Sequence, residues 1–276
     1  MAVTDGRGNG SHARSLLLTV LGEYVAPRQA STWTGTLVEA LGTLGVREKA
    51  ARQALLRSAT DGWLLSERHG RRVRFGLSPE IQDLLATGAR RIYSFGAGRV
   101  DWDGRWLVVV ASVPEEQRHL RHKLRTGLAW AGFGPLGQGV WVCPDAGREE
   151  EARRVVESLG AAVQATSFLG RHAQVGDESA LVARAWDLAD LERRYDSFLT
   201  SFGGADPAGD AEVFRAQTRL VHEWRRFPFL DPGLPDTLLP ATWPGRRARE
   251  LFLRRHAEWA PGAQSWFQAT EAGSTA

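Results

Sequence analysis

The sequence has a single cysteine and no long apolar run among its 276 residues. One thiol, Cys143, cannot form an internal disulfide, which fits a chain that works in a reducing cytoplasm. A membrane-spanning helix needs about 18–20 consecutive apolar residues, and no stretch approaches that length. The first dozen residues, MAVTDGRGNGSH, lack the apolar core of a signal peptide. We therefore expect a cytoplasmic protein with no membrane partner.

Catalytic signatures are missing as well. No G-x-S-x-G, H-E-x-x-H or phosphate-loop motif occurs. Gly132, Gly134 and Gly137 match the spacing of a dinucleotide-binding loop, but a helical pattern precedes them and a strand pattern follows, the reverse of what such a site needs. His119 and His122 lie one helical turn apart, without a cysteine or carboxylate placed to complete a metal site. The sequence predicts a non-enzyme with no cofactor and no metal.

Positive charge, in contrast, is concentrated in one segment. The whole chain has a net charge of +3, whereas residues 47–75 carry eight basic residues against three acidic ones. The same region shows helical patterns over 16–24, 37–44 and 47–59, followed by strand-like runs over 63–68 and 71–77 with a tight turn at His69-Gly70. Three helices followed by a basic hairpin is the order of a winged helix-turn-helix domain.

The third of these helices has the shape needed to enter a DNA groove. Alanines form its inner face and basic or polar residues its outer face, where Arg52 can reach guanine and Gln53 adenine in the major groove. The hairpin tip would lie against phosphates or the minor groove. The predicted DNA-binding residues are Thr34, Arg47, Lys49, Arg52, Gln53, Arg57, Arg68, His69, Arg71, Arg72 and Arg74. The alternative is a merely solvated basic surface; the agreement of helix order, hairpin and charge favours DNA.

Four stretches resemble the PaaX family of bacterial transcriptional repressors. They are RSLLLTVLGEYV (14–25), TWTGTLVEALGTLGVREKAARQALLRSATDGWLLSERHGRRVRFGLS (32–78), RAWDLADLERRYDSFL (184–199) and the proline-punctuated RRFPFLDPGLPDTLLPATWPGRRA (225–248). The family is named for repression of phenylacetate catabolism, with phenylacetyl-CoA as inducer. The resemblance covers about residues 14 to 260. It implies a dimeric repressor with a winged-helix domain, a ferredoxin-like middle domain and a helical C-terminal domain.

The residue patterns of the middle region agree with that architecture. A valine-rich buried strand over 105–112 opens a β-α-β-β-α-β order, which is ferredoxin-like. The predicted fold class is α+β, with a disordered tail over 1–12, a winged helix-turn-helix domain over 13–90, a ferredoxin-like domain over 91–175, a helical effector and dimerisation domain over 176–262, and a flexible tail over 263–276. The middle domain also resembles the small CRISPR-associated nuclease fold. That family's first strand ends in a metal-binding aspartate, where this sequence has Ser112 and no carboxylate, which disfavours a metal-dependent nuclease.

The C-terminal region contains five prolines between 228 and 244. Prolines at this density prevent a regular helix and lower the entropy lost on ordering. The aromatic residues and arginine pairs of this segment suit an aryl group with phosphates. The predicted effector-binding residues are Arg225, Arg226, Phe229, Trp243, Arg246 and Arg247. Alternatively the aromatics fill the core, and the arginines pair with Glu223, Asp231, Asp236 or Glu250 to fasten the loop.

The sequence as a whole predicts a homodimeric repressor that binds a palindromic operator in double-stranded DNA. A small effector, an aryl- or acyl-CoA thioester, would release it. Two alternatives stay open: a metal-dependent nuclease built on the ferredoxin-like domain, and a regulator of a non-catabolic pathway with a non-CoA effector.

Overall fold

The computed structural model describes residues 6–98 and 102–274. Within these ranges no helix has the length and apolar character needed to cross a membrane. The chain forms two compact units, which we call unit 1 (Met1–Phe95, Phe198–Arg225 and Arg249–Ala276) and unit 2 (Gly96–Ser197 and Arg226–Ala248). Each unit is therefore assembled from segments that are far apart in the sequence.

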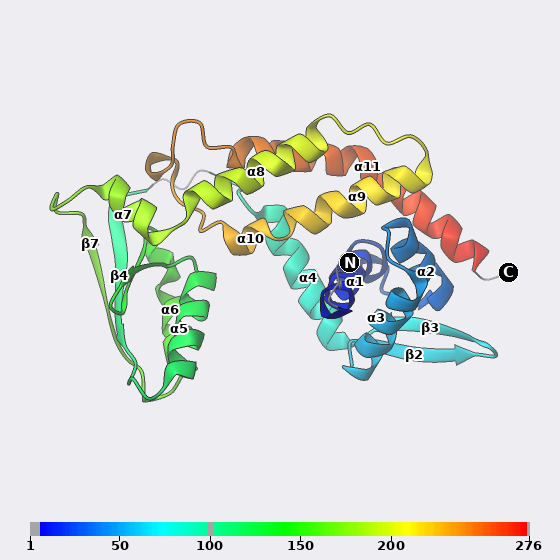
Figure 1. Ribbon diagram of the computed structural model, residues 1–276, viewed down its shortest axis with the longest axis horizontal. Helices are drawn as coiled ribbons and strands as arrows, with labels where there is room; N and C mark the ends of the chain where they lie inside the picture. Colours follow the sequence, from blue (N-terminus) through cyan, green and yellow to red (C-terminus); the bar gives the residue numbers. More distant parts are fainter. Residues whose placement is uncertain (1–5, 99–101, 275–276) are drawn as a thin grey trace, which may run out of the picture. The chain divides into compact units, whose positions relative to one another are not determined.

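The N-terminal part of unit 1 has the order of a winged helix-turn-helix domain (Figure 1). Its helices are α1 (Gly6–Val20), which continues through a π-helical turn and a 3-10 turn to Arg28, α2 (Thr34–Thr43), α3 (Glu48–Thr60) and α4 (Pro79–Ser94). Its strands are β1 (Thr32–Trp33), β2 (Leu64–His69) and β3 (Arg72–Leu77), which form an antiparallel sheet in the order β1-β3-β2. The predicted three helices and hairpin are present, whereas α4 was not predicted.

The C-terminal segments complete the hydrophobic core of unit 1. They comprise α9 (Asp210–Trp224), the end of α8 (Leu188–Gly203) and most of α11 (Gly245–Gly273). Tyr24, which is 1% exposed, packs against the rings of both Phe214 and Phe267, at centroid distances of 5.0 and 5.1 Å. Its hydroxyl shares a 2.9 Å hydrogen bond with Thr218. Since one core contains residues from both ends of the chain, the winged-helix region does not bury its apolar surface alone.

Unit 2 contains the predicted β-α-β-β-α-β order. The elements are β4 (Arg105–Ser112), α5 (Arg118–Trp130), β5 (Gly134–Gly137), β6 (Val140–Cys143), α6 (Glu149–Glu157) and β7 (Gln164–Arg171). The strands form an antiparallel sheet in the order β5-β6-β4-β7. One face, with Leu107 and Val109, packs against α5 and α6; the other, with Trp106, packs against α7 (Glu178–Ala185) (Figure 1). The fold class is the predicted α+β one.

The proline-rich segment belongs to unit 2 and contains one short helix. This helix, α10 (Phe227–Leu230), has Pro228 in its first turn, where the missing N–H has no intrahelical partner in any case. A 3-10 turn over Asp236–Leu238 follows. The expectation of a segment without a regular helix therefore holds except for this single turn.

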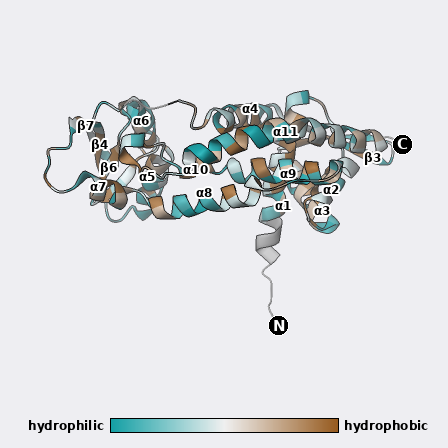
Figure 2. Ribbon diagram, turned by 90° about the horizontal axis from the view of Figure 1, so that it is seen from above, coloured by the Kyte–Doolittle hydropathy of each residue, from teal (hydrophilic) through white to brown (hydrophobic). Residues whose placement is uncertain are grey.

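Two predicted boundaries differ from the structure. Residues 263–276 were predicted as a flexible tail, but α11 continues through Gly273 with Ala263 and Phe267 completely buried. This burial outweighs the backbone hydrogen bond lost at Pro261 inside the helix. At the other end, α1 begins at Gly6, within the predicted tail over 1–12, whose residues 1–5 lie outside the described part of the chain. Both α8 and α11 alternate hydrophilic and hydrophobic residues along their length (Figure 2), as helices with one buried side do.

Candidate nucleic-acid interface

The outer face of α3 is exposed and basic. Ala51, Ala54 and Leu55 of this helix are buried in the core. Every DNA-binding residue predicted here is exposed: Arg47, Lys49, Arg52, Gln53 and Arg57. The structure therefore brings these five side chains together on one solvent-facing surface, as the spacing predicted.

Of these five residues, Arg52 alone forms an ion pair with a described side chain. Its Nε donates to Glu48 Oε1 at 2.8 Å, and the two side chains are 54% and 65% exposed. An exposed i,i+4 pair of this kind contributes only about 0.3–0.5 kcal/mol. The guanidinium of Arg52 can therefore exchange Glu48 for a stronger partner at little cost.

The tip of the β2–β3 hairpin is also exposed. Its turn is Gly70-Arg71, one residue beyond the predicted His69-Gly70, and Gly70 adopts a left-handed φ of +62° that favours glycine. Arg68 Nε donates to the carbonyl of Gly70 at 3.1 Å, and His69 Nε2 lies 3.0 Å from Glu67. Arg71 projects from the turn itself and makes no hydrogen bond or ion pair with the described residues.

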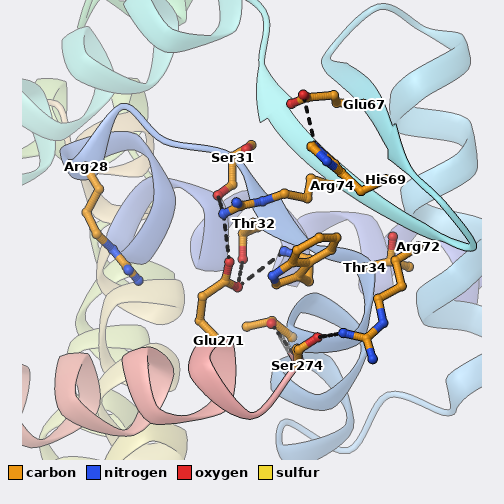
Figure 3. A network of polar contacts seen from close by, with 12 residues as sticks. Arg28, Ser31, Thr32, Thr34, Glu67, His69, Arg72, Arg74, Glu271 and Ser274 are labelled. Carbon is orange, nitrogen blue, oxygen red and sulfur yellow. Dashed lines mark hydrogen bonds and ion pairs between the residues drawn. The ribbon is translucent and has the colours of Figure 1, made fainter. Parts of the chain in front are cut away.

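The first half of β3, from Arg72 to Arg74, is held by the C-terminal end of α11 (Figure 3). Arg74 lies over the ring of Trp33 and donates to the carbonyl of Ser31 at 2.6 Å and to Glu271 Oε1 at 3.1 Å. The other oxygen of Glu271 accepts a short hydrogen bond from Thr32 Oγ1 and one of 3.2 Å from the Trp33 N–H. A single carboxylate thus ties β1 and β3 to α11.

Three further contacts hold the same region. Arg72 Nη1 donates to the carbonyl of Ser274 at 2.9 Å, and Ser274 Oγ accepts from Thr36 at 3.1 Å (Figure 3). Thr34 Oγ1 donates to the carbonyl of Val73 at 2.9 Å. Among the predicted DNA-binding residues, Thr34, Arg72 and Arg74 are therefore bonded to segments of unit 1 that are distant in the sequence.

Sequence reasoning did not identify Glu271, Ser274 or Leu56. Glu271 lies 197 residues from Arg74, so no local pattern connects them. Its one local signal is a carboxylate in the last turn of a helix, where the helix dipole disfavours negative charge. Leu56 is 65% exposed in the middle of the basic face of α3, and an apolar residue on an otherwise polar face was a visible signal.

The predicted effector-binding residues are divided between the two units. Arg225 belongs to unit 1 and donates to the carbonyl of Ser15 at 3.0 Å and to its hydroxyl at 2.7 Å. The others lie in unit 2: Arg226, Phe229, Trp243, Arg246 and Arg247. Each unit must therefore be considered separately when a ligand site is sought.

Within unit 2, the aromatic and basic residues have partners of their own. Arg246 pairs with Asp236 at 2.5 Å, with both side chains more than half exposed, which agrees with the alternative that this arginine fastens the loop. Trp243 packs edge-on against Tyr195 at 5.9 Å, and the exposed Phe229 lies 6.2 Å from Trp130. The small cavity beside Leu230 has a volume of about 150 Å³ and is lined by two aspartates and one arginine, a composition poorly suited to phosphates.

The proline-rich segment is also attached through a buried carboxylate. Asp231 Oδ2 accepts a 2.6 Å hydrogen bond from the Tyr195 hydroxyl, and Oδ1 accepts one of 2.7 Å from the Gly233 N–H. Burial raises the pKa of the Asp231 carboxyl, and the two hydrogen bonds oppose that shift in part. Burial also raises the pKa of the Tyr195 hydroxyl, helped by the neighbouring charge of Asp231.

The strand end that carries a metal-binding aspartate in the CRISPR-associated nucleases carries Ser112 here. It is the last residue of β4, in the position that the sequence predicted. Among the described residues, no group of three or more His, Cys, Asp or Glu side chains could hold a metal ion. The geometry supplies no support for the nuclease alternative.

Comparison with known proteins places the chain in a family. Family models match residues 12–81 (PaaX-like protein), 99–182 (PaaX protein central Cas2-like domain) and 186–269 (PaaX-like protein C-terminal domain). The sequence is 30% identical over 272 residues to the transcriptional repressor PaaX of Escherichia coli (strain K12), covering 95% of this chain and 84% of that protein. The chain belongs to the PaaX family.

The match to PaaX confirms the resemblance on which the family was predicted. A solved structure, the uncharacterized protein Rv0674 from Mycobacterium tuberculosis, has a similar fold, with a TM-score of 0.61 and 24% identity over 91% of this chain and 96% of that one. The Cas2-like PaaX central domain corresponds to the ferredoxin-like sheet and helices of unit 2.

Proposed function

We propose that this PaaX-family chain is a non-enzymatic transcriptional repressor that binds double-stranded DNA through α3 and the β2–β3 hairpin. The observation that supports it is the exposed basic face of α3 beside an exposed basic hairpin tip, in a chain 30% identical to a transcriptional repressor. A polar, basic helix next to a hairpin suits a major groove and its flanking phosphates.

Different residues would have different tasks in this interface. Arg52 and Gln53 read purine edges, and the exposed Leu56 between the basic residues meets a thymine methyl group. The phosphate contacts come from Arg47, Lys49, Arg57, Arg68, His69 and Arg71. Thr34, Arg72 and Arg74 keep the hairpin in place through their own hydrogen bonds. Specificity then resides in α3, and general affinity is shared with the hairpin.

Regulation in this proposal requires a dimer and an effector. A homodimer on a palindrome needs its two reading helices about one DNA turn apart, roughly 34 Å. An effector that binds a differently spaced state more tightly weakens operator binding by that difference in affinity. We propose an aryl- or acyl-CoA thioester, as the family's name-giving member implies, and keep a non-CoA effector of a non-catabolic pathway as the alternative.

Fluorescence anisotropy with DNA from the region upstream of the chain's own gene tests the interface. Arg52→Ala should weaken binding by about 1–3 kcal/mol and relax preference at one base pair, because a bidentate base contact is lost. The matched control is Arg219→Ala, which removes an exposed arginine from α9 of the same unit. If Arg52→Ala and Arg219→Ala bind this DNA with equal affinity, α3 is not the helix that reads the base sequence.

Calorimetry with phenylacetyl-CoA tests the effector. The Arg246–Asp236 pair is mostly solvated, so Arg246→Ala should leave the melting temperature within about 4 °C of the wild type, since an exposed pair contributes at most about 1 kcal/mol. If Arg246 contacts the ligand, Arg246→Ala still binds the operator but is no longer released from it by the effector. If the effector still releases the variant, Arg246 serves only to fasten the loop.

A further inference from the structure

Unit 2 contains a large cleft beside the end of β4. It has a volume of about 850 Å³, within the range of about 300–1,000 Å³ that is typical of small-molecule sites. Three segments line it: residues 110–113 at the end of β4, the first two turns of α5, and the β5–β6 hairpin from Pro135 to Trp141. From the sequence, Ser112 and His122 of this region were considered only for metal sites, which were disfavoured, and no ligand was predicted here.

One wall of the cleft is cationic. The residues that α5 contributes to it are Arg118, Arg121, His122, Leu124 and Arg125. The three arginines and the histidine occupy positions i, i+3, i+4 and i+7, which is one face of a helix. No described aspartate or glutamate lines the cleft. Within the described residues, the only polar contact of these four side chains is one of 3.4 Å from Arg125 to His122 Nδ1, so the charges of the three arginines have no acidic partner.

The neighbouring helix shows how unusual this arrangement is. On α6, Arg153 pairs with both Glu150 and Glu157, the pattern of a solvated helix whose i,i+3 and i,i+4 charges alternate in sign. On α5, like charges stand at the same spacings, which destabilises an isolated helix by a few tenths of a kcal/mol per pair. Clustered cations on a concave wall, without acidic partners, indicate that an anion supplies the missing charge.

The other wall is apolar and firmly placed. Val110, which is 42% exposed, lies there with Val113, Pro135 and Trp141. The hairpin approaches β4 so closely that a Cβ on Gly139 would lie 2.2 Å from the carbonyl oxygen of Ala111, and Gly139 has a φ of +78°. Only glycine fits both conditions, so the hairpin and its apolar surface are held against the strand.

We propose that this cleft binds an organic phosphate, with the phosphate groups on Arg118 and Arg121 of α5 and the ring or acyl group against the β5–β6 hairpin. Guanidinium groups form planar, paired hydrogen bonds with phosphate oxygens, and the apolar wall removes the organic part from water. A DNA duplex could also pair its phosphates with these cations, but it would make no contact with a concave apolar wall. The apolar wall therefore favours a small molecule as the ligand. The proposal rests on the cleft alone and not on the repressor function.

Calorimetry on the full chain at about 0.15 M salt, with ADP, pyrophosphate and adenosine as probes, tests the proposal. ADP should bind more tightly than pyrophosphate, which lacks an organic group, and adenosine, which lacks phosphate, should bind weakest. The double variant Arg118→Ala/Arg121→Ala should bind ADP at least about tenfold more weakly, because the charge-assisted hydrogen bonds from two guanidinium groups to phosphate are lost. Both side chains are exposed, so its melting temperature should equal that of the wild type.

Lys123→Ala is the matched control. Lys123 lies on the same helix and is exposed, but it does not line the cleft, so its removal should change ADP affinity less than about twofold at this salt concentration. If Lys123→Ala and the double variant lose equal affinity for ADP, the loss comes from net charge alone and the proposed site is wrong. Absence of ADP binding at millimolar concentration would also overturn it, as would a double variant that loses affinity for DNA alone. Failure of operator binding through α3 would leave the result with ADP unchanged.

Discussion

Removing the carboxylate of Glu271 should destabilise unit 1 and loosen the attachment of β1 and β3 to α11. The Glu271 side chain is 17% exposed and that of Arg74 30%. Glu271→Ala leaves three donors without their acceptor: the Thr32 hydroxyl, the Trp33 N–H and the Arg74 guanidinium. Thr32 is only 3% exposed, so water replaces the lost acceptor poorly at that position.

The magnitude follows from these three contacts. All three hydrogen bonds are accepted by a carboxylate, and a hydrogen bond to a charged group contributes about 1.5–3 kcal/mol. Two effects oppose this loss, because a carboxylate at a helix C-terminus is unfavourable by about 0.3–1 kcal/mol and alanine is the better helix former by a few tenths. Arg74 also keeps the carbonyl of Ser31 as an acceptor and is part exposed, so we expect Glu271→Ala to lower the free energy of unfolding by about 3–5 kcal/mol, at the low end of the sum.

Thermal unfolding followed by circular dichroism measures this loss. Each kcal/mol lowers the melting temperature of a unit of this size by about 2–4 °C. Glu258→Ala is the matched control, since Glu258 lies on the same helix, is half exposed and, among the residues that the structure describes, pairs only with Arg255 three residues away, where removal changes stability by less than about 1 kcal/mol. A double-mutant cycle of Glu271→Ala with Arg74→Ala should show a coupling of about 1 kcal/mol or more.

Cys143 distinguishes a local loss in unit 1 from a general one. It is 2% exposed in β6 of unit 2, and burial raises the pKa of its thiol to about 11, so labelling at pH 8 reports opening of unit 2. Glu271→Ala should leave the labelling rate unchanged while it lowers the melting temperature. If Glu271→Ala melts like Glu258→Ala, the carboxylate is not a structural tie and the reasoning is refuted.

Three further predictions concern the hairpin, a buried acid and the dimer. Arg71→Ala should weaken binding to all DNA sequences alike and reduce the slope of log K against log salt by about 1 in anisotropy titrations; an unchanged slope would exclude a phosphate contact. Burial raises the folded pKa of Asp231 above its unfolded value, so its favourable contribution is complete below about pH 4 and is lost as the pH rises through the folded pKa. Asp231→Asn should therefore raise the melting temperature more at pH 7 than at pH 4, and equal shifts would contradict the pKa. Phe168 on the edge strand β7 is 60% exposed, which provides an apolar surface for the proposed homodimer. Phe168→Glu should therefore shift the sedimentation coefficient from that of a dimer to that of a monomer, and a monomeric wild type would refute the dimer.

Local pattern predicted most of the elements that carry the site. The valine run of β4 is bounded at Arg105–Ser112 as expected, because a charged residue begins it and a proline follows shortly after it. Helix α3 was predicted within one residue at each end, since its alanines repeat at helical spacing. Helix α4 was missed although the sequence carries its signals: Ser78-Pro79 marks a helix start, and Ile81, Leu84 and Leu85 lie at helical spacing.

Features formed by distant segments could not be predicted from local pattern. The division of the region after residue 176 between two units depends on which core each helix joins, and the stacking of Phe214 and Phe267 on Tyr24 is not visible in any window of sequence. The cleft of unit 2 needs the hairpin and α5 side by side, which only the sheet order β5-β6-β4-β7 provides. His122 could be noted in the sequence, but its neighbours across the cleft could not.

The charge of residues 47–75 illustrates both the strength and the weakness of such reasoning. Eight basic residues indicated correctly where positive charge gathers, but a count by segment treats every cation as available to DNA. Arg72 and Arg74 already bond to the end of α11, and Arg74 is only part exposed. Each phosphate contact adds about 0.9 to the slope of log K against log salt. Because two of the eight cations are already engaged, the slope expected from this segment is smaller by about 1.8. The same two arginines contribute instead to the position of the hairpin on which the other contacts depend.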